Sequence, residues 1–399
     1  GLKMLDEETE KVAGGSKFPG DVAFKLYDTF GFPLDLTQDA LKAKDIEVDT
    51  DAFDACMAEQ KAAARAAWKG SGDVANEQIW FDILEEHGPT EFLGYDSEQA
   101  EAQVLAIVKN GDKVDELRAG EEGIIITNQT PFYGESGGQV GDTGEITATA
   151  SDASLTVTDT RKHLPSLWSH YVKSNEGDIT LSDAVVMKVD HNRRASIRAN
   201  HSVTHLLHEA LRRVLGDHVS QKGSLQDAAR TRFDISHPKG VSQSEIAKVE
   251  EIVIEQIKAN TPVVTRVMPI DEARETGAMA LFGEKYDDEV RVVAMGTNDG
   301  QGDKKKDFSV ELCGGTHVKE TGEIGAFKIT SEGALSSGIR RLEAVTGDNV
   351  AKFEQGKAAA EQETLDKLLT ENQKRREELS GLNGSLDDAV PNAADDILK

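Results

Sequence analysis

The chain has 399 residues, a formal net charge of −27, 38% hydrophobic residues and a mean hydropathy of −0.45, which predict a soluble protein of two to four domains. No run of about 18 apolar residues is present, which excludes a transmembrane helix, and the first residues lack the apolar region of a signal peptide. With only two cysteines, Cys56 and Cys313, a disulfide framework is excluded and a reducing, cytoplasmic location is favoured.

Helical patterns dominate residues 1–75, which we expect to form the first domain. Residues 21–30 place apolar side chains at helical spacing, and Gly31-Phe32-Pro33 ends the pattern because proline lacks an amide donor. Residues 50–69 are rich in Ala, Lys and Arg and predict a second helix. Residues 70–73 then carry the small polar residues of a linker.

Residues 76–186 change to short β-branched runs separated by Gly, Asn or Asp. Strands are expected at residues 103–108, 123–127, 144–149 and 154–158. Short strands with frequent turns predict a small β-barrel domain.

Residues 187–347 mix both patterns and predict an α+β domain. Helices are expected at 200–214, with Asn200 as the N-cap, and at 244–259; strands are expected at 262–267, 289–295 and 325–330. Residues 348–382 are rich in Ala, Glu, Lys and Leu and predict a charged helix, either solvated or the beginning of a coiled coil. We assign residues 348–399 to a fourth region.

Two short motifs in the α+β domain offer ligands to a metal ion. His201 and His205 are four residues apart, which puts both imidazoles on one face of a helix. Cys313 and His317 flank a Gly-Gly-Thr turn. Three imidazoles and a thiolate suit Zn²⁺, so we predict one zinc ion per chain on these four residues. His208, on the same helix face, is either a substitute ligand or a residue behind the site.

A zinc ion in such a site favours ester hydrolysis, since zinc polarises a carbonyl and lowers the pKa of bound water toward about 7. No Glu follows His201, so the metalloprotease base is missing and a general metallohydrolase is disfavoured. Four protein ligands are also typical of a closed structural zinc. The sequence therefore leaves open whether the metal reacts or only positions the substrate.

The acidity of the chain is reversed around the first histidine motif. Residues 190–240 hold nine Lys or Arg against five Asp or Glu, a local net charge of +4. Charge alone fits an ordinary mixed surface, but the overlap with the histidines indicates phosphate contact. Arg194, Arg198 and Lys222 are the candidates.

Seven segments in order along the chain resemble alanyl-tRNA synthetases: AFKLYDTFGFP at 23–33, TPFYGESGGQ at 130–139, NHSVTH at 200–205, SQKGS at 220–224, GAMALFGEKY at 277–286, LCGGTH at 312–317 and RRLEAVTG at 340–347. The resemblance implies the end of a tRNA-recognition domain, a β-barrel, the editing domain of the threonyl/alanyl-tRNA synthetase type, and the start of a C-terminal oligomerisation and tRNA-binding region. Threonyl-tRNA synthetases are similar in fold and share the metal motifs, but they differ between the Cys and the His and lack the segment at 27–33. Free-standing editing proteins lack residues 1–70.

The resemblance implies hydrolysis of Ser-tRNA(Ala) and Gly-tRNA(Ala), because a pocket for alanine cannot fully exclude serine or glycine. By the same resemblance, Gln221 and Thr316 are candidate catalytic residues in contact with the substrate, and Tyr133 and Gln139 are candidates for lining its entrance. The other interpretations are a turn residue for Gln221, a residue that fixes the Gly-Gly turn for Thr316, and a purely structural loop for Tyr133 and Gln139.

Nothing in the sequence resembles the ATP-dependent aminoacylation core of that family, so we expect the chain to edit tRNA but not to charge it. The full-length protein would attach alanine to tRNA(Ala) with ATP in a preceding domain. The expected partners are the acceptor end of tRNA(Ala) and further copies bound through the C-terminal region. Residues 296–306 resemble an insertion, either a hairpin tip or, through the lysines at 304–306, a tRNA contact. The alternative function is a zinc-stabilised tRNA-docking module without catalysis.

Overall fold

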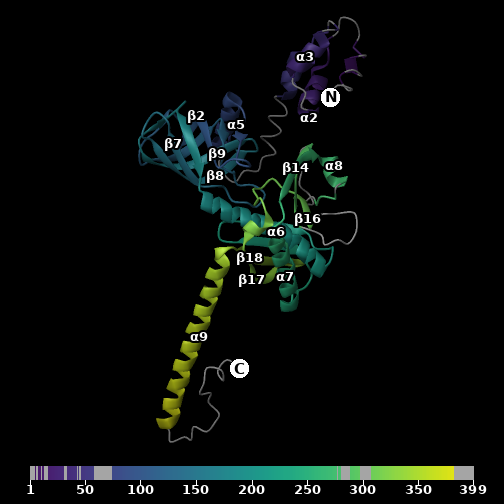
Figure 1. Cartoon of the computed structure of the whole chain (residues 1–399). Coiled ribbons are helices and arrows are strands. Elements are labelled where there is room, and N and C mark those ends of the chain that lie inside the picture. The colour runs from purple at the N-terminus through teal and green to yellow at the C-terminus, as the bar shows by residue number, and fades with distance from the viewer. Residues whose placement is uncertain are drawn as a thin grey trace. The chain divides into compact units, whose positions relative to one another are not determined.

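The structure is a computed structural model that describes residues 5, 8–9, 11–12, 17–30, 34–42, 44, 46–57, 74–275, 277–279, 288–296 and 307–381. The chain divides into two compact units, Gly1–Glu77 and Gln78–Lys399 (Figure 1). Most of the insertion at 296–306 and most of the segment at 277–286 lie outside the described residues. Within the described ranges, no helix has the length and apolar character needed to cross a membrane.

The first unit contains α2 (Gly20–Phe30) and α3 (Leu34–Lys42), and residues 50–57 are also helical. The rest of the helix expected at 50–69 lies outside the described residues. Phe18, Leu26, Leu41 and Phe53 form the centre of a small apolar core.

The second unit begins within α5 (Val74–His87), and a closed antiparallel barrel follows, which confirms the predicted barrel. Its six strands follow one another around the barrel in the order β11 (Ala184–Val189), β7 (Gly144–Ala148), β8 (Ser154–Leu164), β9 (Leu167–Glu176), β5 (Glu122–Thr127) and β2 (Gln99–Lys109). Pairing between β11 and β2 closes the barrel, and β3 (Asp112–Val114) pairs with the far end of β2. Trp80 and Ile83 of α5 pack against barrel residues.

Short strand pairs fasten the connections of the barrel. β1 (Glu91–Phe92) pairs with β6 (Gln129–Thr130), and β10 (Ile179–Thr180) pairs with β4 (Glu116–Leu117). The interior alternates with the strand period, and its fully buried side chains include Ile107, Ile125, Ile146, Leu155 and Val185.

The α+β part packs helices against two sheets. The larger sheet has the order β12 (Gln221–Gln226), β13 (Thr231–Ser236), β18 (Ile339–Thr346) and β17 (Phe327–Ser336), and the smaller has β14 (Val264–Pro269), β15 (Glu289–Met295) and β16 (Ser309–Leu312). Against them lie α6 (His191–Leu215), α7 (Gln243–Ala259), α8 (Ile270–Glu275) and the 3₁₀ helix η1 (Thr321–Ile324). The largely exposed α9 (Asp348–Gly381) follows β18.

The predicted start of α6 is wrong. The helix begins at His191 with Asp190 as N-cap, whose carboxylate accepts a hydrogen bond from the Arg193 amide. Asn200 lies inside the helix, where its side-chain amide donates to Asp227 O at 2.8 Å and accepts from the Thr346 hydroxyl at 2.8 Å. A residue that looked like a cap therefore fixes the helix to the larger sheet.

Candidate metal centre

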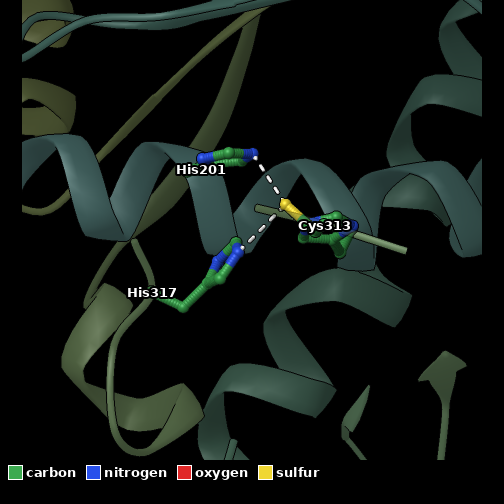
Figure 2. Close-up of side chains that lie close together, drawn as sticks. His201, Cys313 and His317 are labelled. Carbon is green, nitrogen blue, oxygen red and sulfur yellow. Dashed lines mark hydrogen bonds between the residues drawn. The ribbon is translucent and has the colours of Figure 1, made fainter. Parts of the chain in front are cut away.

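Four side chains from two segments meet at one point. His201 and His205 come from α6, while Cys313 and His317 come from the loop after β16. Their ligand atoms all lie within 4.8 Å of one another. Figure 2 shows Cys313 Sγ between two imidazoles, at 3.4 Å from His201 Nε2 and 3.3 Å from His317 Nε2. The structure thus brings together the four residues expected to hold zinc.

Each of the three histidines is oriented through its other ring nitrogen. His201 Nδ1 donates to Gln139 Oε1 at 2.8 Å, and His205 Nδ1 donates to Glu311 Oε2 at 2.7 Å. His317 Nδ1 lies 3.1 Å from the Ser202 hydroxyl. Partners of this kind fix the tautomer and ring orientation of metal-binding histidines, and here they leave all three Nε2 atoms for the centre.

Glu311 contacts two histidines, one through each of its carboxylate oxygens. Its second oxygen lies 2.9 Å from His208 Nδ1, so His208 supports the carboxylate behind His205. His205 Nε2 is buried and has no hydrogen-bond partner among the described residues. A buried ring nitrogen without a partner is costly, and a metal ion bound by three nitrogens and one sulfur would satisfy it. The residues present therefore fit Zn²⁺.

The charges of the cluster favour a thiolate. Burial opposes ionisation of Cys313, but His201, His317 and His205 around its sulfur lower the pKa of that thiol well below its usual value. Burial lowers the pKa of His317 to about 3, against the attraction of Cys313. Burial also works against charge on His205 and Glu311, yet their attraction raises the pKa of His205 and lowers that of Glu311. A thiolate and a neutral His317 are forms that bind a metal, whereas His205 must release the proton that its raised pKa retains when a metal binds.

The Gly-Gly turn permits this close approach at one of its two glycines. A Cβ on Gly315 would lie 2.1 Å from His201 Cε1 and 2.9 Å from Gln139 Oε1. A Cβ on Gly314 would meet no heavy atom within 4 Å. Only position 315 therefore requires glycine for steric reasons.

The barrel supplies part of the centre through the glycine loop (residues 130–139). Gln139 is fully buried, accepts from the Thr316 amide at 2.9 Å and donates to the Thr316 hydroxyl at 2.9 Å. A Cβ on Gly138 would lie 2.5 Å from Ser224 Oγ, so the loop packs directly on β12. Tyr133 is buried beside this loop and donates to Ser136 O at 3.1 Å.

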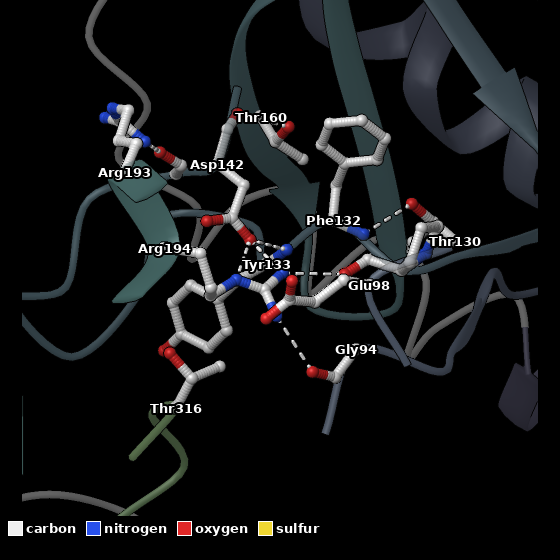
Figure 3. Close-up of polar contacts among 12 residues, drawn as sticks. Gly94, Glu98, Thr130, Phe132, Tyr133, Asp142, Thr160, Arg193, Arg194 and Thr316 are labelled. Atoms are coloured by element: carbon white, nitrogen blue, oxygen red, sulfur yellow. Dashed lines mark hydrogen bonds and ion pairs between the residues drawn. The ribbon is translucent and has the colours of Figure 1, made fainter. Parts of the chain in front are cut away.

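The expectation that Arg194 contacts phosphate is wrong, because this side chain is fully buried. Its guanidinium forms an ion pair with Asp142 and donates to Gly94 O at 2.9 Å and Pro131 O at 2.7 Å. Figure 3 shows Arg194 directed toward Asp142 and Gly94. Arg194 therefore fastens α6 to the barrel.

Arg198 lines a pocket next to the cluster. The pocket has a volume of about 230 Å³, and its lining includes Tyr95, Arg198, Arg291, Thr316, His317 and Lys319. Arg198 is half-buried and paired with Glu98 at 2.6 Å. Three basic side chains, those of Arg198, Arg291 and Lys319, and the acidic Asp96 thus line the same pocket as Thr316 and His317.

The last two candidate site residues, Gln221 and Lys222, lie on β12. Gln221 is half-buried, and its amide donates to Ser224 Oγ at 3.3 Å, while Lys222 is exposed. Through Ser224, Gln221 is linked to the side of the sheet on which the glycine loop packs. Neither residue lines the pocket beside His317.

Comparison with known proteins identifies the family. Residues 1–193 match the family model "tRNA synthetases class II (A)", and residues 290–343 match "Threonyl and Alanyl tRNA synthetase second additional domain". The chain is 57% identical to the alanine–tRNA ligase of Sphingopyxis alaskensis over 360 residues, 90% of this chain and 40% of that protein. It is 58% identical to that of Sinorhizobium medicae over 348 residues, 87% of this chain and 39% of that protein.

The chain belongs to the alanine–tRNA ligase family. It spans about two fifths of the length of these curated relatives. The match to the additional domain includes Cys313, His317 and Glu311, whereas His201 and His205 lie before it.

The sequence of this alanine–tRNA ligase family member does not identify four residues that support the candidate site: Glu311, Tyr95, Arg291 and Asp142. Glu311 gave the clearest signal, as a carboxylate in a short strand two residues before Cys313. The others act through contacts between distant segments, which residue spacing does not reveal.

Proposed function

We propose that this chain is the editing part of an alanine–tRNA ligase and that it hydrolyses Ser-tRNA(Ala) and Gly-tRNA(Ala) at a zinc ion bound by His201, His205, Cys313 and His317. The observation that carries the proposal is the cluster itself, in which each histidine is oriented through Nδ1 and presents Nε2 to the centre. The proposed regions remain 1–75, 76–186, 187–347 and 348–399.

When bound, zinc supplies Lewis-acid polarisation of an ester carbonyl. The protein supports it with the Cys313 thiolate and with Gln139, Glu311 and Ser202, which hold the three imidazoles. His201 and His205 are buried, whereas Cys313 and His317 are partly exposed, and His317 lines the pocket through which substrate and water would reach the centre.

Thr316 and Gln221 are the proposed contacts for the amino acid. Gln139 holds Thr316 by both its amide and its hydroxyl, so the hydroxyl has a fixed position beside His317 in the pocket. A site that pairs with the hydroxyl of serine leaves polar groups without partners when alanine enters, which disfavours the correct product. This requirement supports a fixed polar group rather than an apolar wall.

The tRNA end is proposed to approach over the pocket. Arg198 and Lys319 would meet phosphates there, and the exposed Lys222 would meet the acceptor arm. Tyr133 and Gln139 hold the glycine loop at the entrance. The exposed α9 is proposed to take part in oligomerisation, and ATP-dependent attachment of alanine is assigned to other parts of the whole enzyme.

A deacylation assay tests the proposal. The chain should hydrolyse Ser-tRNA(Ala) and Gly-tRNA(Ala) while leaving Ala-tRNA(Ala) largely intact, and Gln221→Ala should reduce the rate on Ser-tRNA(Ala). The four-ligand donor set favours one rival, a zinc-stabilised docking module without catalysis. That rival predicts no turnover on any substrate, together with a lower melting temperature after zinc removal.

A further inference from the structure

Three successive backbone carbonyls of the metal loop (residues 313–317) accept hydrogen bonds from two side chains in different parts of the fold. Arg291 on β15 donates from Nη1 to Cys313 O at 2.9 Å and to Gly315 O at 2.8 Å. Tyr95, in the turn after β1, donates its hydroxyl to Gly314 O at 2.6 Å. The backbone on both sides of the Gly-Gly turn is therefore bound from outside the loop.

The two side chains also hold each other. The guanidinium of Arg291 lies over the Tyr95 ring, 4.2 Å from its centroid. Phe92 supports the ring edge-to-face at 4.9 Å and itself stacks on Trp168 of the barrel at 5.6 Å. The carbonyl of the preceding residue, Gly94, accepts from Arg194 of α6. The pair is thus anchored to both the barrel and α6, the helix that carries the first two ligands.

A loop with two consecutive glycines has many accessible conformations. Without external contacts, Cys313 and His317 would have to be ordered when the metal binds, at an entropic cost that weakens affinity. Contacts that fix the backbone in advance remove this cost.

We infer that Tyr95 and Arg291 are positioning residues that hold the Cys313–His317 loop in its metal-binding conformation. Neither touches the proposed ligand atoms, and both act on the backbone that carries them. The consequence for catalysis rests on the proposed function, but the effect on the loop and on zinc affinity does not.

The test compares Tyr95→Phe and Arg291→Lys with two matched controls. Tyr95→Phe keeps the ring and removes only the hydroxyl that binds Gly314 O. Its control is Tyr171→Phe, which removes a barrel hydroxyl that bonds to His163 at 2.9 Å. Arg291→Lys keeps the charge but not the guanidinium fork, and its control is Arg266→Lys on the neighbouring strand β14. Arg291→Ala completes the series.

Two measurements need no tRNA. Zinc affinity, from competition with a chelator, should fall about tenfold in Tyr95→Phe and Arg291→Lys and further in Arg291→Ala. In the metal-free protein, hydrogen exchange at the Gly315 and Thr316 amides should accelerate in the same variants, while both controls match the wild type. The melting temperature of the metal-free protein should change no more than in the controls.

A third measurement links the loop to turnover. In Tyr95→Phe, kcat on Ser-tRNA(Ala) should fall while KM stays within about twofold, because the ring still lines the pocket. Unchanged zinc affinity and unchanged amide exchange would overturn the inference. Absence of deacylation in the wild type, with altered zinc affinity in the variants, would instead reject only the proposed function.

Discussion

Gln139 of the barrel and His201 of α6 share a buried hydrogen bond of 2.8 Å between Oε1 and Nδ1. The same oxygen accepts from the Thr316 amide, and the same side chain donates to the Thr316 hydroxyl. One barrel residue therefore orients a ligand from the first metal motif and a residue within the second. The barrel is part of the metal centre.

Two substitutions of Gln139 should separate its contact with His201 from its contact with the Thr316 hydroxyl. Gln139→Ala should lower zinc affinity about 10- to 100-fold, because the His201 ring loses the acceptor that fixes its tautomer. Gln139→Glu keeps that acceptor but cannot donate to the Thr316 hydroxyl, so it should retain most of the zinc affinity and lose discrimination between Ser-tRNA(Ala) and Ala-tRNA(Ala). Equal zinc affinity in Gln139→Ala and wild type, measured by chelator competition, would contradict this role.

The two glycines of the metal loop should respond differently to alanine. In Gly315→Ala the new methyl would lie 2.1 Å from His201 Cε1, so this ligand must move and zinc should be lost. Gly314→Ala meets no atom within 4 Å and should keep its zinc. The metal content of both purified variants gives the answer, and equal zinc in the two would show that the His201 contact is unimportant.

Hydrophobic period predicts the barrel and the long helices α7 and α9, but it identifies only β17 of the four strands in the larger sheet. The barrel was predicted from four short runs, and β15 matches its expected range of 289–295. β9 and β11 were missed: β9 buries Ser169 and His170 and so lacks the apolar alternation of a strand. Polar residues satisfied by barrel partners are invisible to a pattern based on hydrophobicity.

The candidate site also contains residues that the sequence identifies and residues that only the fold brings together. The four proposed ligands stand out because their spacing and chemistry are local, and the structure brings them together. Arg194 was misjudged because charge counting cannot distinguish an exposed arginine from one buried against Asp142. Gln139, Tyr95 and Arg291 reach the metal loop across long sequence separations, and that information exists only in the folded chain.

Removing Arg194 should destabilise the fold. Arg194→Met leaves the Asp142 carboxylate buried without its cation, at a cost of about 3–5 kcal/mol in the free energy of unfolding. Arg193→Met is the control, because the side chain of this partly exposed neighbour donates a hydrogen bond to Gly141 O and pairs with no carboxylate among the described residues. The double variant Arg194→Met/Asp142→Asn should recover part of the loss in urea unfolding. A double variant less stable than Arg194→Met would contradict the account.

The barrel should lose stability in mild acid through His170. Burial lowers the pKa of this residue to about 4, although Nδ1 donates to Ile125 O, while in the unfolded chain the pKa is near 6.5. The unfolded state therefore binds a proton first as pH falls. Stability is retained above pH 6.5 and declines toward pH 4, by about 3 kcal/mol in total.

Comparison with His170→Gln isolates this contribution. The difference in unfolding free energy between wild type and variant should shrink as pH falls from about 6.5 to 4. A difference between wild type and His170→Gln that is constant with pH would rule out His170 as the titrating group.

The most direct test of the zinc-editing proposal is the rate of Ser-tRNA(Ala) hydrolysis by the same preparation before zinc removal, after removal and after zinc is restored. We expect the metal-free protein to lose at least about a hundredfold in rate and to regain it with zinc. Cys313→Ala should stay inactive in zinc while remaining folded, and Cys56→Ala should behave as wild type. Undiminished hydrolysis by folded, zinc-free protein would contradict the proposal.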